Sequence, residues 1–230
     1  MRDLVVIPAR AGSVGVIGKN KRELAGKPLI LHTVNFARKH FSDSQICVST
    51  DDKEIITLVE AEGLDVPFVR PDSLATSEAT SEDVLKHALR YYRENKDFDA
   101  ERVVMLQPTS PFRRDEDLED MLNLYHDDLD MVVSGRLSQA NPYYTLFEFR
   151  QDGYLEKSKP GNFTRRQDCP KIFEFNGSIY IMNGKRLEEK GIGGFDKILP
   201  YVMDVKYSVD IDTELDFLWC EFLSVNIHYL

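Results

Sequence analysis

Two short segments of the sequence, near its two ends, carry residues that could act on a phosphorylated substrate. Residues 8–20 contain three glycines together with Arg10 and Lys19. Backbone amides in a glycine-rich loop can bind phosphate without steric hindrance, and the two cations would balance its charge. Near the other end, Asp210 and Asp212 stand two positions apart, so both carboxylates of an extended chain point to the same side. Such a pair can hold Mg²⁺ against substrate phosphates, so the two segments together predict phosphate chemistry.

Both segments also have a purely structural interpretation. The glycine segment could be an ordinary turn whose cations are solvated. The acidic segment could cap the N-terminus of a final helix, with Asp212 or Thr213 as the capping residue. Local pattern leaves these alternatives open, and a capping role and a metal role for the acidic segment are compatible.

The spacing of the glycines excludes two common nucleotide-binding motifs. No G-x-G-x-x-G pattern passes through Gly12, Gly15 and Gly18, so the loop is not a dinucleotide fingerprint. Gly12 also stands one residue too far from Gly18 and Lys19 for a Walker loop, and Asn20 replaces the Ser or Thr that would hold Mg²⁺. The pattern therefore argues against hydride transfer and against a P-loop kinase or ATPase.

Composition limits the partners that this chain can have. The 230 residues carry a formal net charge of −10, which argues against a general nucleic-acid binder because neutralising phosphates requires a basic face. Cys47, Cys169 and Cys220 are odd in number and widely spaced, so neither a disulfide framework nor a zinc site is indicated. We expect a reducing compartment.

The N-terminal apolar run is too short for a signal peptide and lacks a small-residue cleavage site. No stretch approaches the roughly 18 consecutive apolar residues of a membrane helix. We therefore expect a cytoplasmic protein with no membrane partner.

Short apolar runs alternate with amphipathic stretches along most of the chain. The runs predict strands at residues 4–7, 46–48, 66–69, 103–106 and 178–182. The amphipathic stretches predict helices at residues 28–37, 52–61, 81–95, 115–125 and 214–223, with Ser81 as the N-cap of the third helix. This alternation predicts an α/β fold, a three-layer sandwich with a mostly parallel, Rossmann-like sheet. Ligands are expected at the carboxyl ends of the strands.

The pattern changes at about residue 141. Alternating aromatic residues lead to a turn signal at residues 151–153, which predicts a hairpin. We expect one domain over residues 1–230, with this hairpin as an excursion at about residues 141–171.

Several motifs in order along the chain resemble the cytidylyltransferase family that contains the CMP-sialic acid synthetases. Residues 9–20 match the loop pattern A-R-x-G-S-K-G-x-x-x-K-N except at Val14, where the family usually has lysine. Further matches are VSTDD at residues 48–52, RP and LA within residues 70–75, LQPTSPFR at 106–113, NGSIY at 176–180 and DIDT at 210–213. The resemblance covers nearly the whole chain, and it implies a nucleotide-diphospho-sugar transferase type of fold.

The resemblance implies a role for each matched residue. It implies a catalytic apparatus of Arg10, Lys19, Asp210 and Asp212, in which the two aspartates bind Mg²⁺. The implied nucleotide-binding residues are Ala9, Arg10, Gly12, Ser13, Lys19, Asn20, Arg70 and Ser81. The implied sugar-binding residues are Gln107, Tyr144, Arg166, Asn176 and Tyr180. Tyr180 could instead be a core aromatic residue, and Arg166 a solvated loop cation.

Two departures from the family pattern affect the substrate. Val14 removes a cation from the phosphate loop, so Arg10, Lys19 and the metal must neutralise the triphosphate. Tyr144 stands where some sialic acid enzymes of the family have lysine. Together with residues 161–167, this position is more similar to members that act on legionaminic acid, so N-acetylneuraminic acid and legionaminic acid both remain candidates.

The implied reaction couples CTP to a nonulosonic acid, with release of pyrophosphate. The resemblance also implies a homodimer in which the excursion packs against the partner and brings Arg166 to its site. Two alternatives remain: a cytidylyltransferase for 3-deoxy-manno-octulosonate, and a non-catalytic nucleotide-binding module of the same fold, which the loss of a cation at Val14 suggests. The five histidines lie outside the matched motifs, and we assign them no role.

Overall fold

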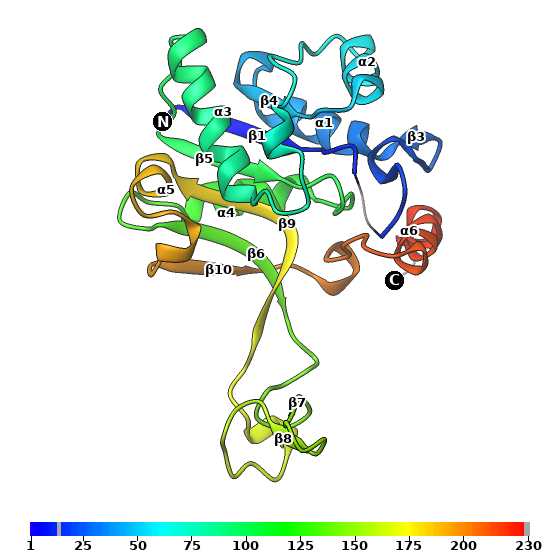
Figure 1. The fold of residues 1–230 in the computed structure, drawn as a ribbon, viewed down its shortest axis with the longest axis vertical. Helices are drawn as coiled ribbons and strands as arrows, with labels where there is room; N and C mark the ends of the chain where they lie inside the picture. The colour runs from blue at the N-terminus through cyan, green and yellow to red at the C-terminus, as the bar shows by residue number, and fades with distance from the viewer. Residues whose placement is uncertain (13–14, 228–230) are drawn as a thin grey trace.

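A six-stranded sheet forms the centre of the protein (Figure 1). The computed structural model describes residues 1–12 and 15–227 of the chain. The strands of the sheet lie in the order β10-β6-β9-β5-β1-β4. Their bounds are β1 Asp3–Pro8, β4 Ile46–Ser49, β5 Arg102–Leu106, β6 Met131–Leu137, β9 Phe173–Asn183 and β10 Ile198–Val202. Only β9 runs antiparallel to its neighbours among these six strands, which confirms a mostly parallel sheet.

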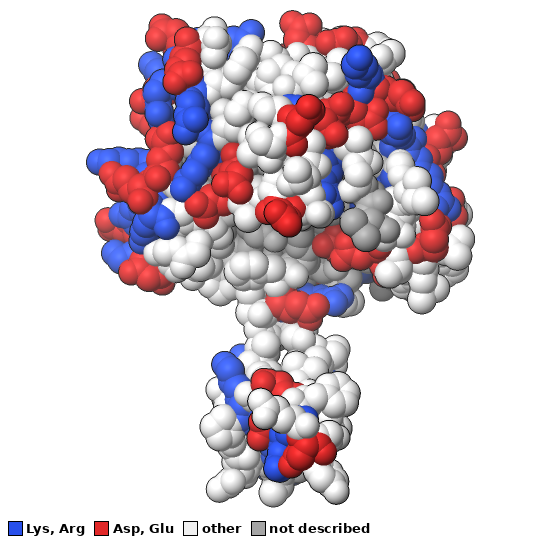
Figure 2. Space-filling model, in the orientation of Figure 1, with Lys and Arg blue, Asp and Glu red and all other residues white. Residues whose placement is uncertain are grey.

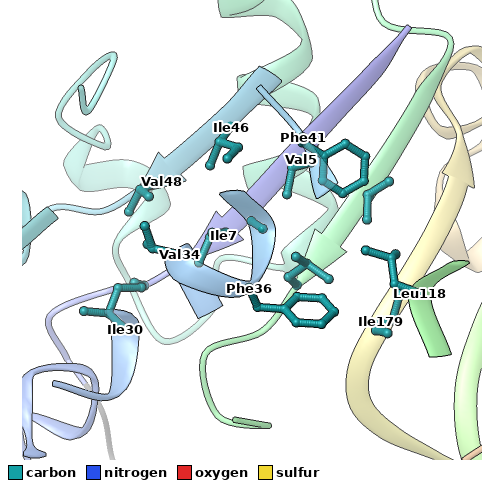
Figure 3. Close-up of a cluster of buried hydrophobic side chains, with 14 of the residues drawn as sticks. Val5, Ile7, Ile30, Val34, Phe36, Phe41, Ile46, Val48, Leu118 and Ile179 are labelled. Carbon is teal, nitrogen blue, oxygen red and sulfur yellow. The ribbon is translucent and has the colours of Figure 1, made fainter. Parts of the chain in front are cut away.

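Helices cover both faces of the sheet because successive strand residues point to opposite sides. Helices α1 (Leu29–His40), α2 (Lys53–Ala61) and α4 (Asp115–Leu124) pack over Val5, Ile7 and their neighbours (Figure 3). Helices α3 (Ser81–Asn95) and α5 (Gly184–Lys190) pack over the other face, against Leu4 and Val6. The three-layer sandwich is therefore confirmed.

Helix α6 (Glu214–Asn226) lies beside the glycine segment at the edge of the body (Figure 1). Its buried side chains Phe217 and Cys220 form a third apolar cluster with Val16, Leu24 and Ile211. This cluster packs the C-terminal helix against the segment that follows β1. The two-residue strands β2 (Glu23–Leu24) and β3 (Lys27–Pro28) pair with each other between the glycine segment and α1. Short 3₁₀ helices lie at Lys19–Lys21, Asp43–Gln45, Asp72–Leu74, Arg166–Asp168, Ile192–Gly194 and Val205–Tyr207.

The predicted hairpin is present and projects from the body on a stem (Figure 1). Strands β7 (Phe147–Phe149) and β8 (Leu155–Lys157) form it, and the turn lies at residues 151–153 as expected. The stem consists of the end of β6 and the start of β9, which pair down to Leu137 and Phe173.

Two sequence-based expectations were wrong. No strand lies at residues 66–69, where the structure has only a single bridge between Val69 and Thr50. Pro67 has no N–H to donate to a ladder, which accounts for the interruption. The N-cap of α3 is Thr80, not Ser81: the Thr80 hydroxyl accepts from the Asp83 amide and the Asp83 carboxylate accepts from the Thr80 amide.

Strands β6 and β10 and helix α5 were not anticipated. None of the helices in the described ranges 1–12 and 15–227 is both long enough and apolar enough to cross a membrane.

Candidate active site

A cavity of about 350 Å³ opens at the carboxyl ends of β1 and β5, beside the N-terminus of α3. It is lined by Pro8, Arg10, Gly15, Lys19, Asn20, Arg70, Ala79, Thr80, Ser81, Val84, Gln107, Pro108, Thr109, Asp210 and Asp212. Ligand sites of open α/β sheets are expected at this position. On the face shown in Figure 2, basic and acidic side chains are interspersed over the body. A phosphate group would therefore depend on the cations of the cavity itself.

The glycine segment is held against the acidic segment at very short range. A Cβ atom at Gly15 would lie only 1.9 Å from the backbone oxygen of Asp212, so no larger residue fits there without movement. On the other side, the amide of Ala11 donates to the Asp51 carboxylate over 2.9 Å. Ala9 is fully buried, and neither Ala9 nor Gly12 lines the cavity. Ser13 and Val14 lie outside the described residues.

Two cations of the glycine segment border the cavity. Lys19 is largely buried, donates to the backbone oxygen of Ile211 and lies 3.6 Å from the Asp212 carboxylate. Arg10 donates to the backbone oxygen of Thr76 over 2.9 Å, and its other nitrogens stay available to a ligand in the cavity. Both cations are thus placed to meet phosphate oxygens.

Asn20 carries an unpaired buried atom in the cavity wall. Its amide nitrogen lies 3.4 Å from the backbone oxygen of Arg10. Its carbonyl oxygen Oδ1 is buried and finds no hydrogen-bond partner within the part of the chain that the structure describes. A buried acceptor of this kind is costly, so a donor on a bound molecule would stabilise the site.

The wall opposite the glycine segment is formed by Arg70 and the start of α3. Arg70 is 4% exposed, its Nε donates to the Ser49 hydroxyl over 3.1 Å, and burial lowers the pKa of its guanidinium. Thr80 and Ser81 line the cavity at the helix N-terminus, where free amides favour an acceptor or an anion.

Asp210 and Asp212 line the same cavity, but their surroundings differ. Burial raises the pKa of Asp210, and the nearby charge of Asp212 adds to the rise. The Oδ1 atom of Asp210 is buried and unpaired within the described residues, whereas the Asp212 side chain is exposed. The capping role falls to Thr213, whose hydroxyl accepts from the Asp216 amide. Both carboxylates are therefore free of the helix cap.

This donor set fits Mg²⁺. The described residues contain no group of three or more His, Cys, Asp or Glu side chains that could enclose a metal ion. Two carboxylates, with substrate phosphates and water as the remaining ligands, are the usual protein contribution to a magnesium site. A cation beside Asp210 would also offset the cost of its buried charge.

Gln107, the first of the residues that the resemblance assigns to the sugar, lines the cavity. The chain opposite it turns at Gly177 with φ +69°, and a Cβ there would lie 2.7 Å from the Asp210 carboxylate and 3.0 Å from the Gln107 amide oxygen. Asn176 supports this turn: its side chain accepts from Ser134 over 2.7 Å and donates to Ser208 over 3.0 Å. The Asn176 amide is thus occupied within the protein and shapes the wall from behind.

Tyr180 follows the turn on β9, one strand from the cavity. It is not among the residues lining the cavity, but burial and the charge of Asp210 raise the pKa of its phenol. It packs partly against the apolar cluster under α3.

Comparison with known proteins places these features in one family. Residues 4–218 match the family model of the cytidylyltransferases. The chain belongs to the cytidylyltransferase family. It is 35% identical over 224 residues to an N-acylneuraminate cytidylyltransferase of Streptococcus agalactiae, covering 95% of this chain and 52% of that protein. This chain thus spans about half the length of the streptococcal relative.

Another relative matches over nearly its whole length. A CMP-N,N'-diacetyllegionaminic acid synthase of Legionella pneumophila is 33% identical over 223 residues, covering 96% of this chain and 95% of that protein. Among solved structures, a CMP:2-keto-3-deoxy-manno-octonic acid synthetase complexed with CTP aligns with a TM-score of 0.72 and 20% identity, over 99% of this chain and 100% of that chain. At that identity the structural match confirms the fold type alone.

In this cytidylyltransferase, Tyr144 and Arg166 lie in the excursion and do not line the cavity. Arg166 is exposed and its guanidinium donates to the side chain of Gln139 over 2.6 Å. Within one chain these two predicted sugar-binding residues are separate from the other site residues.

Sequence reasoning assigned no role to Arg113, Thr109 or Thr80. Arg113 is half-buried beside the cavity residue Gln107, where it donates to the Thr33 hydroxyl over 3.0 Å and to the backbone oxygens of Ser178 and Gln107. Burial lowers its pKa to about 9. An arginine that follows Ser-Pro-Phe in a loop is typical of a solvated surface cation. The sequence pattern therefore did not predict these internal hydrogen bonds.

Proposed function

We propose that this cytidylyltransferase couples CTP to a nonulosonic acid in the presence of Mg²⁺, giving the CMP-sugar and pyrophosphate. The observation that carries the proposal is that Lys19, Asp210 and Asp212, from opposite ends of the chain, line one cavity. The two relatives described above support it, since both are named as enzymes that form CMP-sugars of this class.

In the proposed arrangement the cytosine lies between Asn20, Arg70 and the N-terminus of α3. The unpaired carbonyl of Asn20 would accept from the cytosine amino group, and Ser81 would contribute a hydroxyl. The triphosphate would then lie along the glycine segment, where Arg10 and Lys19 balance its charge.

The sugar's anomeric hydroxyl would attack the α-phosphorus, and pyrophosphate would leave on the opposite side. Mg²⁺ held by Asp210 and Asp212 would supply charge stabilisation for the phosphates. Arg10 and Lys19 orient the leaving group and stabilise the charge that develops on it. No histidine stands among the described cavity residues, and we assign no general base.

We further propose a homodimer built on the excursion. Large apolar side chains of the hairpin face solvent in one chain, including Phe149, which is 86% exposed, and Tyr154, which is 71% exposed. A second copy would cover these groups. In such a dimer the excursion of one subunit could bring Tyr144 and Arg166 to the site of the other. Cys47, Cys169 and Cys220 are free thiols, in line with our proposal that the enzyme works in the cytoplasm.

Pyrophosphate release from CTP tests the proposed reaction. The purified protein is incubated with CTP, Mg²⁺ and, one at a time, N-acetylneuraminic, legionaminic and 3-deoxy-manno-octulosonic acids. We expect release with a nonulosonic acid and none after chelation of the metal. Release only with the octulosonate would support the eight-carbon alternative, and CTP binding without release from any sugar would support the non-catalytic module.

A further inference from the structure

Three aromatic side chains form a row along the outer half of β9. The ring centroids of Phe173 and Phe175 are 6.0 Å apart, and those of Phe175 and Tyr180 are 6.1 Å apart. Both pairs meet edge to face, the geometry that aromatic quadrupoles favour. The row, Phe173, Phe175 and Tyr180, starts beside the cavity and leads toward the stem of the excursion.

Two backbone features create the row. Gly135 on β6 pairs with Phe175, and a Cβ at Gly135 would lie 2.5 Å from the Phe173 ring, so the missing side chain makes room for that ring. Between Phe175 and Tyr180 the pairing with β6 shifts register, and residues 176–178 pair with neither neighbouring strand, so they bulge out of β9. The bulge returns Tyr180 to the same side as Phe175 and brings the rings together.

The bulge also fixes the row relative to the reacting groups. Gly177, at its tip, lies against both the Asp210 carboxylate and the Gln107 amide. Phe175 precedes Gly177 by two residues and Tyr180 follows it by three. The row therefore starts at the end of the cavity that holds Asp210 and Gln107, opposite the nucleotide wall at Arg70 and Ser81.

The cavity is too small to hold both substrates, so part of the sugar would bind outside it. About 350 Å³ lies at the lower end of the range for a single drug-sized ligand, so a nucleotide leaves little room for a nine-carbon sugar. A bound sugar would therefore extend past Asp210, toward the bulge that follows Phe175 on β9. The Phe175 ring is 49% exposed, which leaves a wide apolar surface in water beside a polar site.

We propose that Phe175 forms the apolar wall of the acceptor subsite and contacts the methyl of an acylamino group on the sugar. The inference rests on the proposed function and extends it to a residue outside the cavity. Tyr180 supports the Phe175 ring by its edge contact, and Phe173 supports it from the other side. Loss of the ring should weaken acceptor binding and leave CTP binding intact.

The test compares Phe175→Ala and Phe175→Leu with Phe222→Ala. Phe222 is a suitable control because it is 48% exposed and lies on α6, away from the row. We expect Phe175→Ala to lower kcat/KM for the nonulosonic acid by roughly 10- to 200-fold, the effect of one apolar contact of this kind, with the KM for CTP changed less than twofold. Phe175→Leu keeps an apolar side chain, so its kcat/KM should fall less than that of Phe175→Ala. The kcat/KM of Phe222→Ala should match the wild type.

Melting temperature and sedimentation are measured on every variant. The inference is overturned if a folded Phe175→Ala keeps the wild-type acceptor KM, or if its KM for CTP rises as much. Dissociation of the assembly by Phe175→Ala alone would place the ring between two copies and would also overturn it. Wild-type protein without turnover on any nonulosonic acid would overturn the proposed function itself, and this inference with it.

Discussion

The Lys19 ammonium lies 3.6 Å from the Asp212 carboxylate and donates to the backbone oxygen of Ile211, which joins the glycine segment to the acidic segment. Residues almost two hundred positions apart in the sequence thus share one wall of the cavity. The packing of Val16 against Phe217 holds the two segments together from below. The cation that we propose for phosphate and a carboxylate that we propose for the metal are therefore positioned by the same contact.

The first prediction concerns the two cations of the glycine segment. Arg10→Ala and Lys19→Ala should each lower turnover by about a hundredfold or more, because each removes a charge that faces phosphate in the transition state. Lys185→Ala is the control, since this side chain is 82% exposed on α5 and its ion pair with Glu189, over 3.7 Å, lies on the surface of that helix. Wild-type turnover in either loop variant would remove the phosphate-loop assignment.

The second prediction separates two glycines of the same segment. A Cβ at Gly15 would overlap the backbone oxygen of Asp212, whereas a Cβ at Gly12 would meet no atom of the described residues within 4 Å. Gly15→Ala should displace the acidic segment and lower turnover by about a hundredfold, as expected for a shift of about 1 Å in a catalytic group. Gly12→Ala should keep near wild-type turnover. Equal activity in the two variants would contradict the close approach at Gly15.

The central fold could be predicted because most strands are buried on both faces. Leu4, Val5, Val6 and Ile7 are all fully buried, so the run is apolar without alternation, as in a covered parallel strand. Strand β10 was missed for the opposite reason: it lies at the edge of the sheet, alternates exposed residues and contains Pro200. Edge position depends on the order of strands, which no local pattern contains.

The sequence indicated four residues that the structure brings into one cavity, but it did not indicate their contacts with one another. Arg10, Lys19, Asp210 and Asp212 were proposed from two separate motifs, and all four line one cavity. Lys19 contacts the acidic segment because α6 packs against the glycine segment. Residues far apart in the sequence make this packing, so no local pattern predicts it. Arg113 was missed because its hydrogen bonds to the backbone oxygens of Gln107 and Ser178 are likewise set by tertiary packing.

The third prediction separates structure from binding at the start of α3. Thr80→Ala removes the N-cap and should cost about 1 kcal/mol, which lowers the melting temperature by roughly 2–4 °C in a protein of this size. Ser81→Ala leaves the cap intact and should raise the KM for CTP with an unchanged melting temperature. A stability loss in Ser81→Ala as large as that in Thr80→Ala would show that Ser81 acts in the helix itself.

The fourth prediction follows from the buried carboxylate of Asp210. Burial raises the pKa of Asp210 in the folded state, so the ionised carboxylate lowers the free energy of unfolding at neutral pH. This loss of stability disappears at low pH, where the carboxyl is protonated in both the folded and the unfolded states. In chelator, Asp210→Asn should therefore raise the melting temperature at pH 7 and lose this advantage as the pH falls through the acid range. The same variant should lose turnover with Mg²⁺.

Asp212→Asn is the matched control for that pH series. Its side chain is 79% exposed, so the substitution should leave the melting temperature nearly unchanged at pH 7. A lower melting temperature for Asp210→Asn than for the wild type at pH 7 in chelator would show that the carboxylate stabilises the fold through contacts.

The last prediction concerns the sugar and depends on Tyr144 and residues 162–167 of the excursion. Legionaminic acid carries a second acylamino group and a terminal methyl where N-acetylneuraminic acid has hydroxyls, and in the proposed dimer Tyr144 would offer these groups an apolar face. One such contact is worth about 1 to 3 kcal/mol, so kcat/KM should be roughly 10 to 200 times higher for legionaminic acid. Tyr144→Lys should reduce that preference, because a lysine favours a polar partner. Parallel kinetics on the two sugars measure both effects. A clear preference of the wild type for N-acetylneuraminic acid would reject legionaminic acid as the favoured substrate and leave the cytidylyltransferase reaction in place.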